Sequence, residues 1–459
     1  MCNQKRTKDM NRLRSYVWMV CLLCASALAG SCSREVVSTP DGGPDAGGSG
    51  AEAGSLRIVI RTPSPDAVVN PASRAEAEDG ETAADDGTDT PAAALHEVQE
   101  WTVKKLGVYI FMAQSAGAKD NAYFLVQKTE GITFGTEETE GPKGTDLGNG
   151  EYSYTEPLQD WMIGKYLKVL LVANEGVLED IELDTNHDGT AGTTLETFKT
   201  LTAGAVLDNS EGQSADKISG GAYTGEGDLT GGAYTGIVMS GTAMKGTAEE
   251  IHLASPASLE LEALLTRNVA RIDICLNKKK LTLKKAVLRT TARKAYLFAQ
   301  ATTAAPEGAL LTDYPLLPVL KYAELLGDGK PGITYQNPAS DTEAEEVTRD
   351  RNTLKHVFYL YEQVNAEGSC ATVEVTYTLP DADGVEQTGV LEIPFRKTTT
   401  EGKGDYVNTT RNHLYTVELG DGSLDGKVTA RIVVQDWEPN EILEFLPGDD
   451  SEAVAEPEP

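Results

Sequence analysis

Apolar and polar residues alternate along many short stretches of this chain, the pattern of β-strands with one buried face. Residues 55–61 form a short β-branched run, and residues 100–112 show mostly period-two alternation. The stretch YLKVLLVA at residues 166–173 is apolar enough for a central strand. Further strands are predicted at residues 122–127, 259–276, 281–289, 357–361, 371–379, 390–394, 413–419 and 428–437.

Helical periodicity is weak by comparison. Residues 195–207 carry loosely spaced apolar positions that suit one short helix. Strands joined by turns, without regular βαβ spacing, favour antiparallel sheets over a parallel one. We therefore predict an all-β fold: two β-sandwich domains in tandem, transthyretin- or immunoglobulin-like, with few short helices.

The first residues have the pattern of an export signal. Arg12 and Arg14 precede an apolar run at residues 16–29, which is shorter than the roughly 20 residues needed to span a bilayer. Small residues immediately before Cys32 resemble a bacterial lipobox, in which the cysteine is acylated and becomes the new N-terminus. The alternative is an ordinary signal peptide with an incidental cysteine. Met1 and Met10 both remain candidate starts.

The cysteines support export. Three of the six cysteines precede Cys32 and would leave with the signal, so that only Cys275 and Cys370 remain beside the acylated one. Two thiols form no disulfide framework. Each lies in or beside an apolar stretch, which favours two separate structural thiols over a disulfide between them.

The charge excludes some partners. With 40 Lys and Arg against 71 Asp and Glu, the net charge is −31. Nucleic-acid binding depends on Lys and Arg at phosphates, and anionic membrane surfaces attract basic segments. We therefore expect no nucleic-acid partner, and membrane contact only through the lipid of the precursor.

Catalytic patterns are missing from the sequence. It has no G-x-S-x-G, no phosphate-binding P-loop and no H-E-x-x-H motif. Its five histidines, His96, His187, His252, His356 and His413, do not occur at metal-ligand spacing. We expect no enzyme and no cofactor.

One segment has the first half of a calcium-binding loop. Asp184, Asn186 and Asp188 occupy alternate positions before Gly189, as in D-x-[DN]-x-[DN]-G. The twelfth position should be Glu but is Leu195. Asp and Asn beside Gly also make ordinary Asx-turns. Calcium is therefore the weaker interpretation and a plain turn the stronger one.

Several motifs together resemble the fimbrillins of Bacteroidales, the Fim/Mfa-type major and minor subunits of donor-strand (type V) pili. In order along the chain, the motifs are the lipobox-like Cys32, Ser73-Arg74-Ala75, WTVKKLGVY at residues 101–109, VLLVAN at 169–174, TRNVAR at 266–271, RNHLY at 411–415 and VVQDW at 433–437. The resemblance covers the whole chain, although no motif alone is specific.

The resemblance implies a structural role. It implies that the chain is exported as a lipoprotein, palmitate included, to the cell outer membrane and cut between Arg74 and Ala75 by an arginine-specific protease. Arg57 and Arg61 are alternative cleavage sites, because the gap from Arg61 to Arg74 is long. The domains expected on this basis are a signal peptide at 1–31, a tether and propeptide strand at 32–74, sandwiches at 75–278 and 279–448, joined by a lysine-rich linker at 278–280, and an acidic tail at 449–459.

A sandwich that loses a strand exposes unpaired backbone groups and an apolar groove. A neighbouring subunit can fill such a groove by β-augmentation, and head-to-tail contacts of this kind build a filament. The expected donor is the C-terminal stretch at 428–446, with Val428, Ile432, Val434, Trp437, Ile442 and Phe445 as its apolar positions. Alternatively, 428–437 is an internal strand and 440–446 is the donor.

The expected partners are other fimbrial subunits, a host or bacterial surface receptor and the protease. The competing hypothesis is a surface lipoprotein of the outer membrane that binds a glycan or host ligand and never polymerises. Stalk, tip, accessory and anchor roles are not distinguished by the sequence.

Overall fold

The structure is a computed structural model of the chain. It describes residues 52–62, 100–135, 141–175, 178–179, 181–203, 236–311, 315–319, 322, 324–399, 402–421, 428–436 and 442–445. All of these belong to one compact unit, residues 50–459. The predicted signal peptide, Cys32, Arg74, Ala75, Trp437 and the acidic tail lie outside the described residues.

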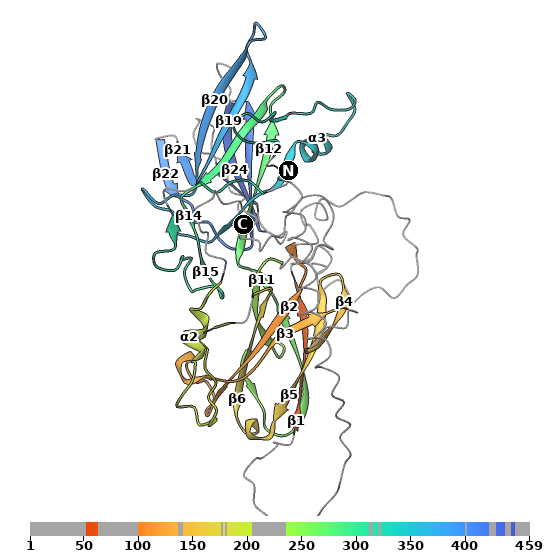
Figure 1. Cartoon of the computed structure of the whole chain (residues 1–459), viewed down its shortest axis with the longest axis vertical. Coiled ribbons are helices and arrows are strands. Elements are labelled where there is room, and N and C mark those ends of the chain that lie inside the picture. Colours follow the sequence, from red (N-terminus) through yellow and green to blue (C-terminus); the bar gives the residue numbers. More distant parts are fainter. Residues whose placement is uncertain are drawn as a thin grey trace, which may run out of the picture. The chain divides into compact units, whose positions relative to one another are not determined.

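The fold is all-β, as predicted from the alternating pattern (Figure 1). In the described residues there are two short α-helices, α2 (Leu195–Lys199) and α3 (Glu345–Arg351), and two short 3₁₀ turns, η5 (Asp120–Ala122) and η6 (Asp160–Met162). The predicted helix at 195–207 is thus confirmed in its first residues, where the Thr194 side chain caps it by accepting from the Thr197 amide. None of these helices has both the length and the apolarity that crossing a bilayer requires.

The strands up to residue 267 make up what we call the first region. They are β1 (Glu52–Arg61), β2 (Lys105–Ala113), β3 (Phe124–Phe134), β4 (Lys143–Gly148), β5 (Glu151–Gln159), β6 (Tyr166–Ala173), β7 (Thr202–Ala203), β8 (Met239–Met244), β9 (Ile251–His252), β10 (Ala257–Leu264) and β11 (Thr266–Arg267).

All of these strands except β7, which pairs with residues 295–296, form a sheet that closes on itself. The order is β11-β8-β10-β1-β5-β4-β3-β2-β6-β9, and β8 also pairs with β6. The ring therefore runs from β8 through β10, β1, β5, β4, β3, β2 and β6 back to β8. Its enclosed core includes side chains from all of these strands except β4, and β1 contributes three of them, Leu56, Ile58 and Ile60. The N-terminal strand is thus an integral part of the ring.

The strands from residue 269 onward make up the second region. They are β12 (Val269–Asn277), β13 (Thr282–Arg289), β14 (Thr291–Ala292), β15 (Ala295–Tyr296), β16 (Leu310–Leu311), β17 (Ile333–Thr334), β18 (Thr353–Tyr361), β19 (Thr372–Pro380), β20 (Glu386–Pro394), β21 (Arg396–Thr399), β22 (Gly402–Tyr406), β23 (His413–Asp421), β24 (Val428–Asp436) and β25 (Ile442–Phe445).

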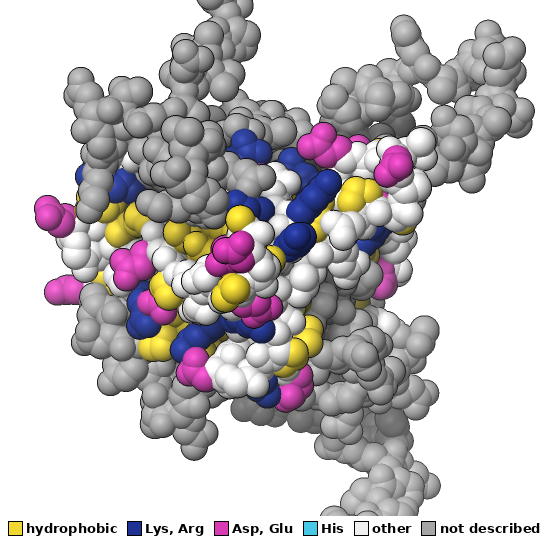
Figure 2. All heavy atoms as spheres, turned by 90° about the horizontal axis from the view of Figure 1, so that it is seen from above, with side chains coloured by type: hydrophobic (Ala, Val, Ile, Leu, Met, Phe, Trp, Pro, Cys, Tyr) yellow, Lys and Arg dark blue, Asp and Glu magenta, His cyan; other side chains and the backbone are white. Residues whose placement is uncertain are grey.

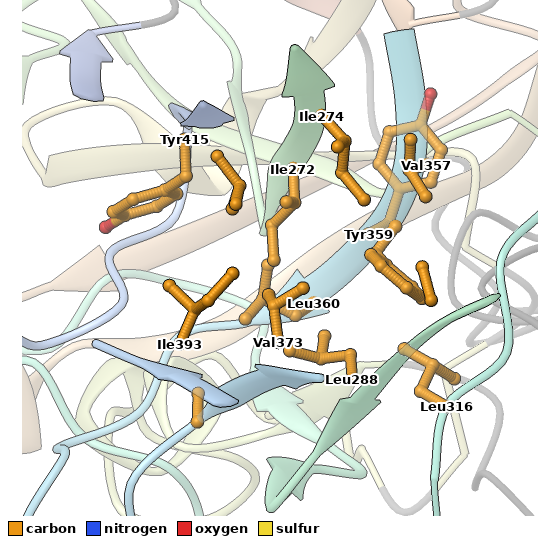
Figure 3. Packing of buried hydrophobic residues seen from close by; sticks show 14 of the residues in the cluster. Ile272, Ile274, Leu288, Leu316, Val357, Tyr359, Leu360, Val373, Ile393 and Tyr415 are labelled. Atoms are coloured by element: carbon orange, nitrogen blue, oxygen red, sulfur yellow. The ribbon is translucent and has the colours of Figure 1, made fainter. Parts of the chain in front are cut away.

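Two sheets of the second region pack face to face, in the orders β18-β12-β23-β24-β25 and β17-β13-β19-β20. Figure 3 shows the packing: Ile272 and Leu360 from the first of these sheets meet Val373 and Ile393 from the second. This is the sandwich predicted for the C-terminal half.

The strand that ends at the predicted domain boundary pairs within the second region. β12 pairs with β18 on one side and with β23 on the other. Lys278, Lys279 and Lys280 lie in the short connection from β12 to β13, where the Leu281 amide donates to the Lys278 carbonyl. Cys275 and Cys370 are both free thiols, as favoured from the sequence.

Candidate functional site: the groove filled by β1

The first candidate site is the groove that β1 occupies. β1 runs parallel to β10, from Gly54 opposite Ala257 to Arg61 opposite Leu264, and antiparallel to β5. Its backbone therefore pairs with a neighbour on both sides along most of its length. Removing it would leave the facing edges of β5 and β10 without partners.

Alternate side chains of β1 fill the interior of the groove. Leu56, Ile58 and Ile60 are completely buried and belong to the core of the first region. Each such side chain contributes roughly 1.5–3 kcal/mol of burial free energy. The predicted strand at 55–61 thus places its apolar face where period-two alternation requires.

Gly54 fixes the start of the strand. Its φ is +127°, and a Cβ added there would lie 2.1 Å from the carbonyl oxygen of Ala257. A larger residue would therefore push β1 away from β10. At the other end, the Thr62 amide and hydroxyl both donate to the carbonyl of Gly150, at 2.9 and 3.1 Å.

The outward side chains of β1 meet glutamates on both neighbouring strands. Arg57 forms an ion pair with Glu260 of β10. Arg61 donates from Nε to Glu151 of β5 at 2.9 Å and from Nη1 to Glu262 of β10 at 3.2 Å. The hydrogen bond to Glu151 raises the pKa of Arg61. We call Glu151, Glu260 and Glu262 the acidic rim of the groove.

A further glutamate lies inside the groove. Glu156 of β5 is opposite Leu56 and is buried. Its Oε1 accepts from Thr129 Oγ1 at 2.7 Å and from Gln127. Burial, followed by the charge of Glu156, raises the pKa of Tyr154 to about 12.

A second polar site lies around Glu100, which is the first described residue after residue 62. The Glu100 carboxylate is fully buried and accepts from Arg271 Nη1 at 3.1 Å and from the Tyr359 hydroxyl at 2.8 Å. His356 Nδ1 lies 2.6 Å from the same carboxylate. Arg271 also binds Asp273 through two hydrogen bonds of 2.7 and 2.6 Å.

The pKa of Glu100 shows how strongly this cluster favours the ionised form. Burial by itself would raise the pKa of the carboxyl group. The charge of Arg271, then that of His356 and the hydrogen bond to His356, outweigh burial and hold the pKa well below its ordinary value. We call Glu100, Arg271, Asp273, His356 and Tyr359 the buried ionic cluster.

Residues of the sequence motifs serve as structural connections. Asn174, at the end of VLLVAN, accepts from the Lys104 amide at 2.7 Å and donates to the carbonyls of Thr102 and Ile237, each at 2.8 Å. Arg267, from TRNVAR, donates to the Glu100 carbonyl at 2.7 Å. These motif residues therefore hold strand ends together.

The proposed donor residues lie in two strands. Val428, Ile432 and Val434 are buried within β24, which pairs with β23 over its whole length. Ile442 and Phe445 lie on β25, which pairs with β24 only over residues Ile432–Gln435. In this chain, stretch 428–436 therefore pairs as a strand of the second region.

The calcium-like loop forms a network of turn hydrogen bonds. The buried carboxylate of Asp184 accepts from the backbone amides of His187 and Gly189, at 3.0 and 2.7 Å, and Asp188 accepts from the amide of Thr190 at 3.0 Å. Asn186 lies within the turn between them. Across the described part of the chain, no group of three or more His, Cys, Asp or Glu residues could hold a metal ion.

Figure 2 shows basic, acidic and apolar side chains interspersed over one face of the molecule. The sequence reasoning missed both the acidic rim and the buried ionic cluster. For the rim a signal was present: residues 259–262 read Leu-Glu-Leu-Glu, the alternation of a strand with one acidic face. For the cluster there was none, since Glu100 and Arg271 are distant in sequence.

No protein-family model and no curated protein matches the chain. Among solved structures, it is similar to the tip fimbrial protein Mfa3 from Porphyromonas gingivalis, with 13% identity over 84% of this chain and 99% of that one and a TM-score of 0.42. A fimbrial protein from Bacteroides vulgatus has 13% identity over 72% and 92% of the two chains and a TM-score of 0.36. The fimbrial anchor protein Mfa2 from Porphyromonas gingivalis has 9% identity over 85% and 99%, with a TM-score of 0.30.

At such identities and TM-scores the likeness assigns no activity or partner to this chain.

Proposed function

We propose that this chain is a structural fimbrial subunit that polymerises by donor-strand exchange and supports cell adhesion at the outer-membrane surface. The precursor is exported as a lipoprotein through Cys32 and is cut between Arg74 and Ala75. The observation that carries the proposal is the position of β1. This strand precedes the proposed cleavage site in the chain and yet supplies three core side chains to the closed sheet.

Cleavage would convert β1 into a separate peptide held only by non-covalent contacts. Its departure opens the ring between β5 and β10, exposing unpaired backbone groups and an apolar groove. A strand of another subunit restores both the main-chain pairing and the buried side chains. Because donor and groove are different surfaces, the contact repeats head to tail and builds a filament.

The structure supports Arg74 over the two alternative cleavage sites. Arg57 and Arg61 lie within β1, where both residues pair with β5 and β10. A protease requires an accessible segment, and backbone within a sheet ladder is protected from it. Cleavage at Arg57 or Arg61 would require β1 to leave the groove first.

The proposal is tested on the purified, unlipidated precursor treated with an arginine-specific protease. We expect a ladder of stable oligomers on denaturing gels without boiling, and the variant Arg74→Ala should remain monomeric under the same treatment. Arg57→Lys and Arg61→Lys serve as controls and should assemble as the parent does. If the treated protein stays monomeric, or if Arg74→Ala also forms the ladder, the pilin proposal fails and the non-polymerising lipoprotein becomes the better description.

A further inference from the structure

The acidic rim gives the groove a charge preference as well as a shape. Glu260 and Glu262 on β10 and Glu151 on β5 face the outward positions of the resident strand, and both arginines of that strand pair with them. An occupant that placed acidic side chains at these positions would bring like charges together, and its binding would be disfavoured. The rim therefore favours strands with basic outward residues.

A second segment of this chain has the same pattern as β1. Residues 57–60 read Arg-Ile-Val-Ile, and residues 431–434 of β24 read Arg-Ile-Val-Val. At the ends of the match, Ser55 corresponds to Thr429, whereas Arg61 corresponds to the uncharged Gln435. Aligned in this way, each apolar inward position of β1 has an apolar counterpart in β24.

The two strands also make the same kind of ion pair. Arg57 is opposite Glu260 of the neighbouring strand β10 and binds it. Arg431 is opposite Glu418 of its own neighbour, β23, and binds that carboxylate. In both cases the arginine precedes a completely or almost completely buried isoleucine, Ile58 or Ile432.

We propose that Glu260 selects the strand that fills the groove by pairing with an arginine, and that residues 429–435 of a second copy of this chain meet this requirement. Thr429 then takes the place of Ser55, Arg431 that of Arg57, and Ile432 that of Ile58. This inference rests on the proposed function and adds to it the identity and register of the donor.

The other candidate donor does not fit the rim. Residues 441–446 read Glu-Ile-Leu-Glu-Phe-Leu. Because side chains alternate in a strand, either way of inserting this segment places one of its two glutamates in the apolar interior and the other toward the acidic rim. The sequence of the terminal segment therefore opposes binding in this groove.

The exchange requires β24 to leave its own sheet. There it pairs with β23 along its length but with β25 only over Ile432–Gln435. In the groove, β5 and β10 each flank the resident strand over nearly its whole length. A transferred strand would thus pair over nearly its whole length on both sides in the groove, whereas in its own sheet it does so only with β23.

Charge reversal tests the selection by Glu260. After cleavage with the arginine-specific protease, Glu260→Arg and Arg431→Glu should each reduce the fraction of oligomer by at least about tenfold, and the double variant should recover it. Glu307→Arg is the matched control, because Glu307 is exposed and lies outside the groove. Circular dichroism of each uncleaved variant reports whether it folds.

A disulfide trap tests the register independently of charge. In the precursor the hydroxyls of Ser55 and Ser258 lie 3.3 Å apart, so Thr429 of an incoming strand would lie beside Ser258. The variant Ser258→Cys/Thr429→Cys should therefore give oligomers joined by disulfides, which only reducing agent separates. Ser258→Cys/Glu444→Cys should not.

The outcomes distinguish this inference from the proposed function. If the parent protein does not assemble after cleavage, donor-strand exchange itself fails. If the parent assembles but Glu260→Arg assembles equally well, or the double reversal does not recover oligomer, the selection by Glu260 is wrong. A disulfide ladder from Glu444→Cys in place of Thr429→Cys would identify the terminal segment as the donor.

Discussion

β1 and Glu100 lie on either side of residues 63–99 in the chain. Different kinds of interaction hold β1 and Glu100 in place. β1 is held by main-chain pairing, apolar side chains and ion pairs at the surface, where Arg57 and Glu260 remain about half exposed, at 49% and 59%. Glu100 is held by a fully buried ionic cluster with Arg271, His356 and Tyr359. A strand held in the first way can be replaced by another of similar pattern, whereas a buried charge cannot leave its partners without a large penalty.

This difference between β1 and Glu100 is compatible with proteolytic cleavage of the chain between them. Upstream of Arg74, β1 carries contacts that a second strand can reproduce, whereas Glu100, downstream, is held by contacts that it cannot. Under the proposed function, the cut separates an exchangeable strand from a body in which Glu100 stays bound.

The largest expected effect comes from removing the central cation of the buried ionic cluster. Arg271→Ala leaves the carboxylates of Glu100 and Asp273 buried without the guanidinium that pairs with both. We therefore expect a loss of about 3–5 kcal/mol in the free energy of unfolding. Denaturant unfolding of the precursor measures this. Arg289→Ala, which removes a partly exposed ion pair with Glu374, should cost about 1 kcal/mol or less. Equal losses would contradict the contrast between buried and surface charges.

The next effect concerns the apolar side of β1. Ile58→Ala should lower the free energy of unfolding by about 2–4 kcal/mol, because the removed atoms are completely buried in the ring core. It should also speed the release of β1 after cleavage, measured by mass spectrometry of the freed peptide. Val59→Ala, at the neighbouring outward position, should change both quantities much less.

The third effect is a dependence on pH. The pKa of Glu100 is lowered on folding, so its ionisation stabilises the folded protein above the ordinary glutamate value of 4.5, and this contribution is lost as the pH falls below it. The variant Glu100→Gln should therefore be less stable than the parent at neutral pH and should approach it toward pH 3. Thermal unfolding across this range gives the two curves, and parallel curves would refute the assignment.

The smallest expected effect is that of the rim on stability. Arg57→Ala should change the free energy of unfolding by less than about 1 kcal/mol, since exposed ion pairs contribute little. Denaturant unfolding of the precursor checks it. A loss as large as that of Ile58→Ala would mean that the rim holds β1 in place and does not merely select the strand.

How much of this could be predicted from the sequence differs between elements. The strand at 55–61 was predicted, because its run of apolar and β-branched residues is a local property. The partners of Val269–Asn277 could not be predicted, because nothing local in this strand shows that β18 and β23, which pair with it, come from the C-terminal half. The same limitation applies to the buried ionic cluster, whose members come together only through folding.

The acidic rim lies between these two cases. The Leu-Glu alternation at 259–262 was visible in the sequence and predicts a strand with one acidic face. What that face binds depends on which strand lies beside it. Arg57 and Glu260 are 203 positions apart in the chain, and their side chains meet because β1 lies parallel to β10.

The sequence by itself determined the all-β class and the strand at 55–61, since the two-residue period of strands and local apolar character decide these wherever the strand lies. The tertiary structure alone decided that the first strand closes a ring between β5 and β10, that Glu260 faces its arginine, and that β12 belongs to the second region. These depend on long-range pairing, where many registers satisfy the same alternation and only the packed core selects one.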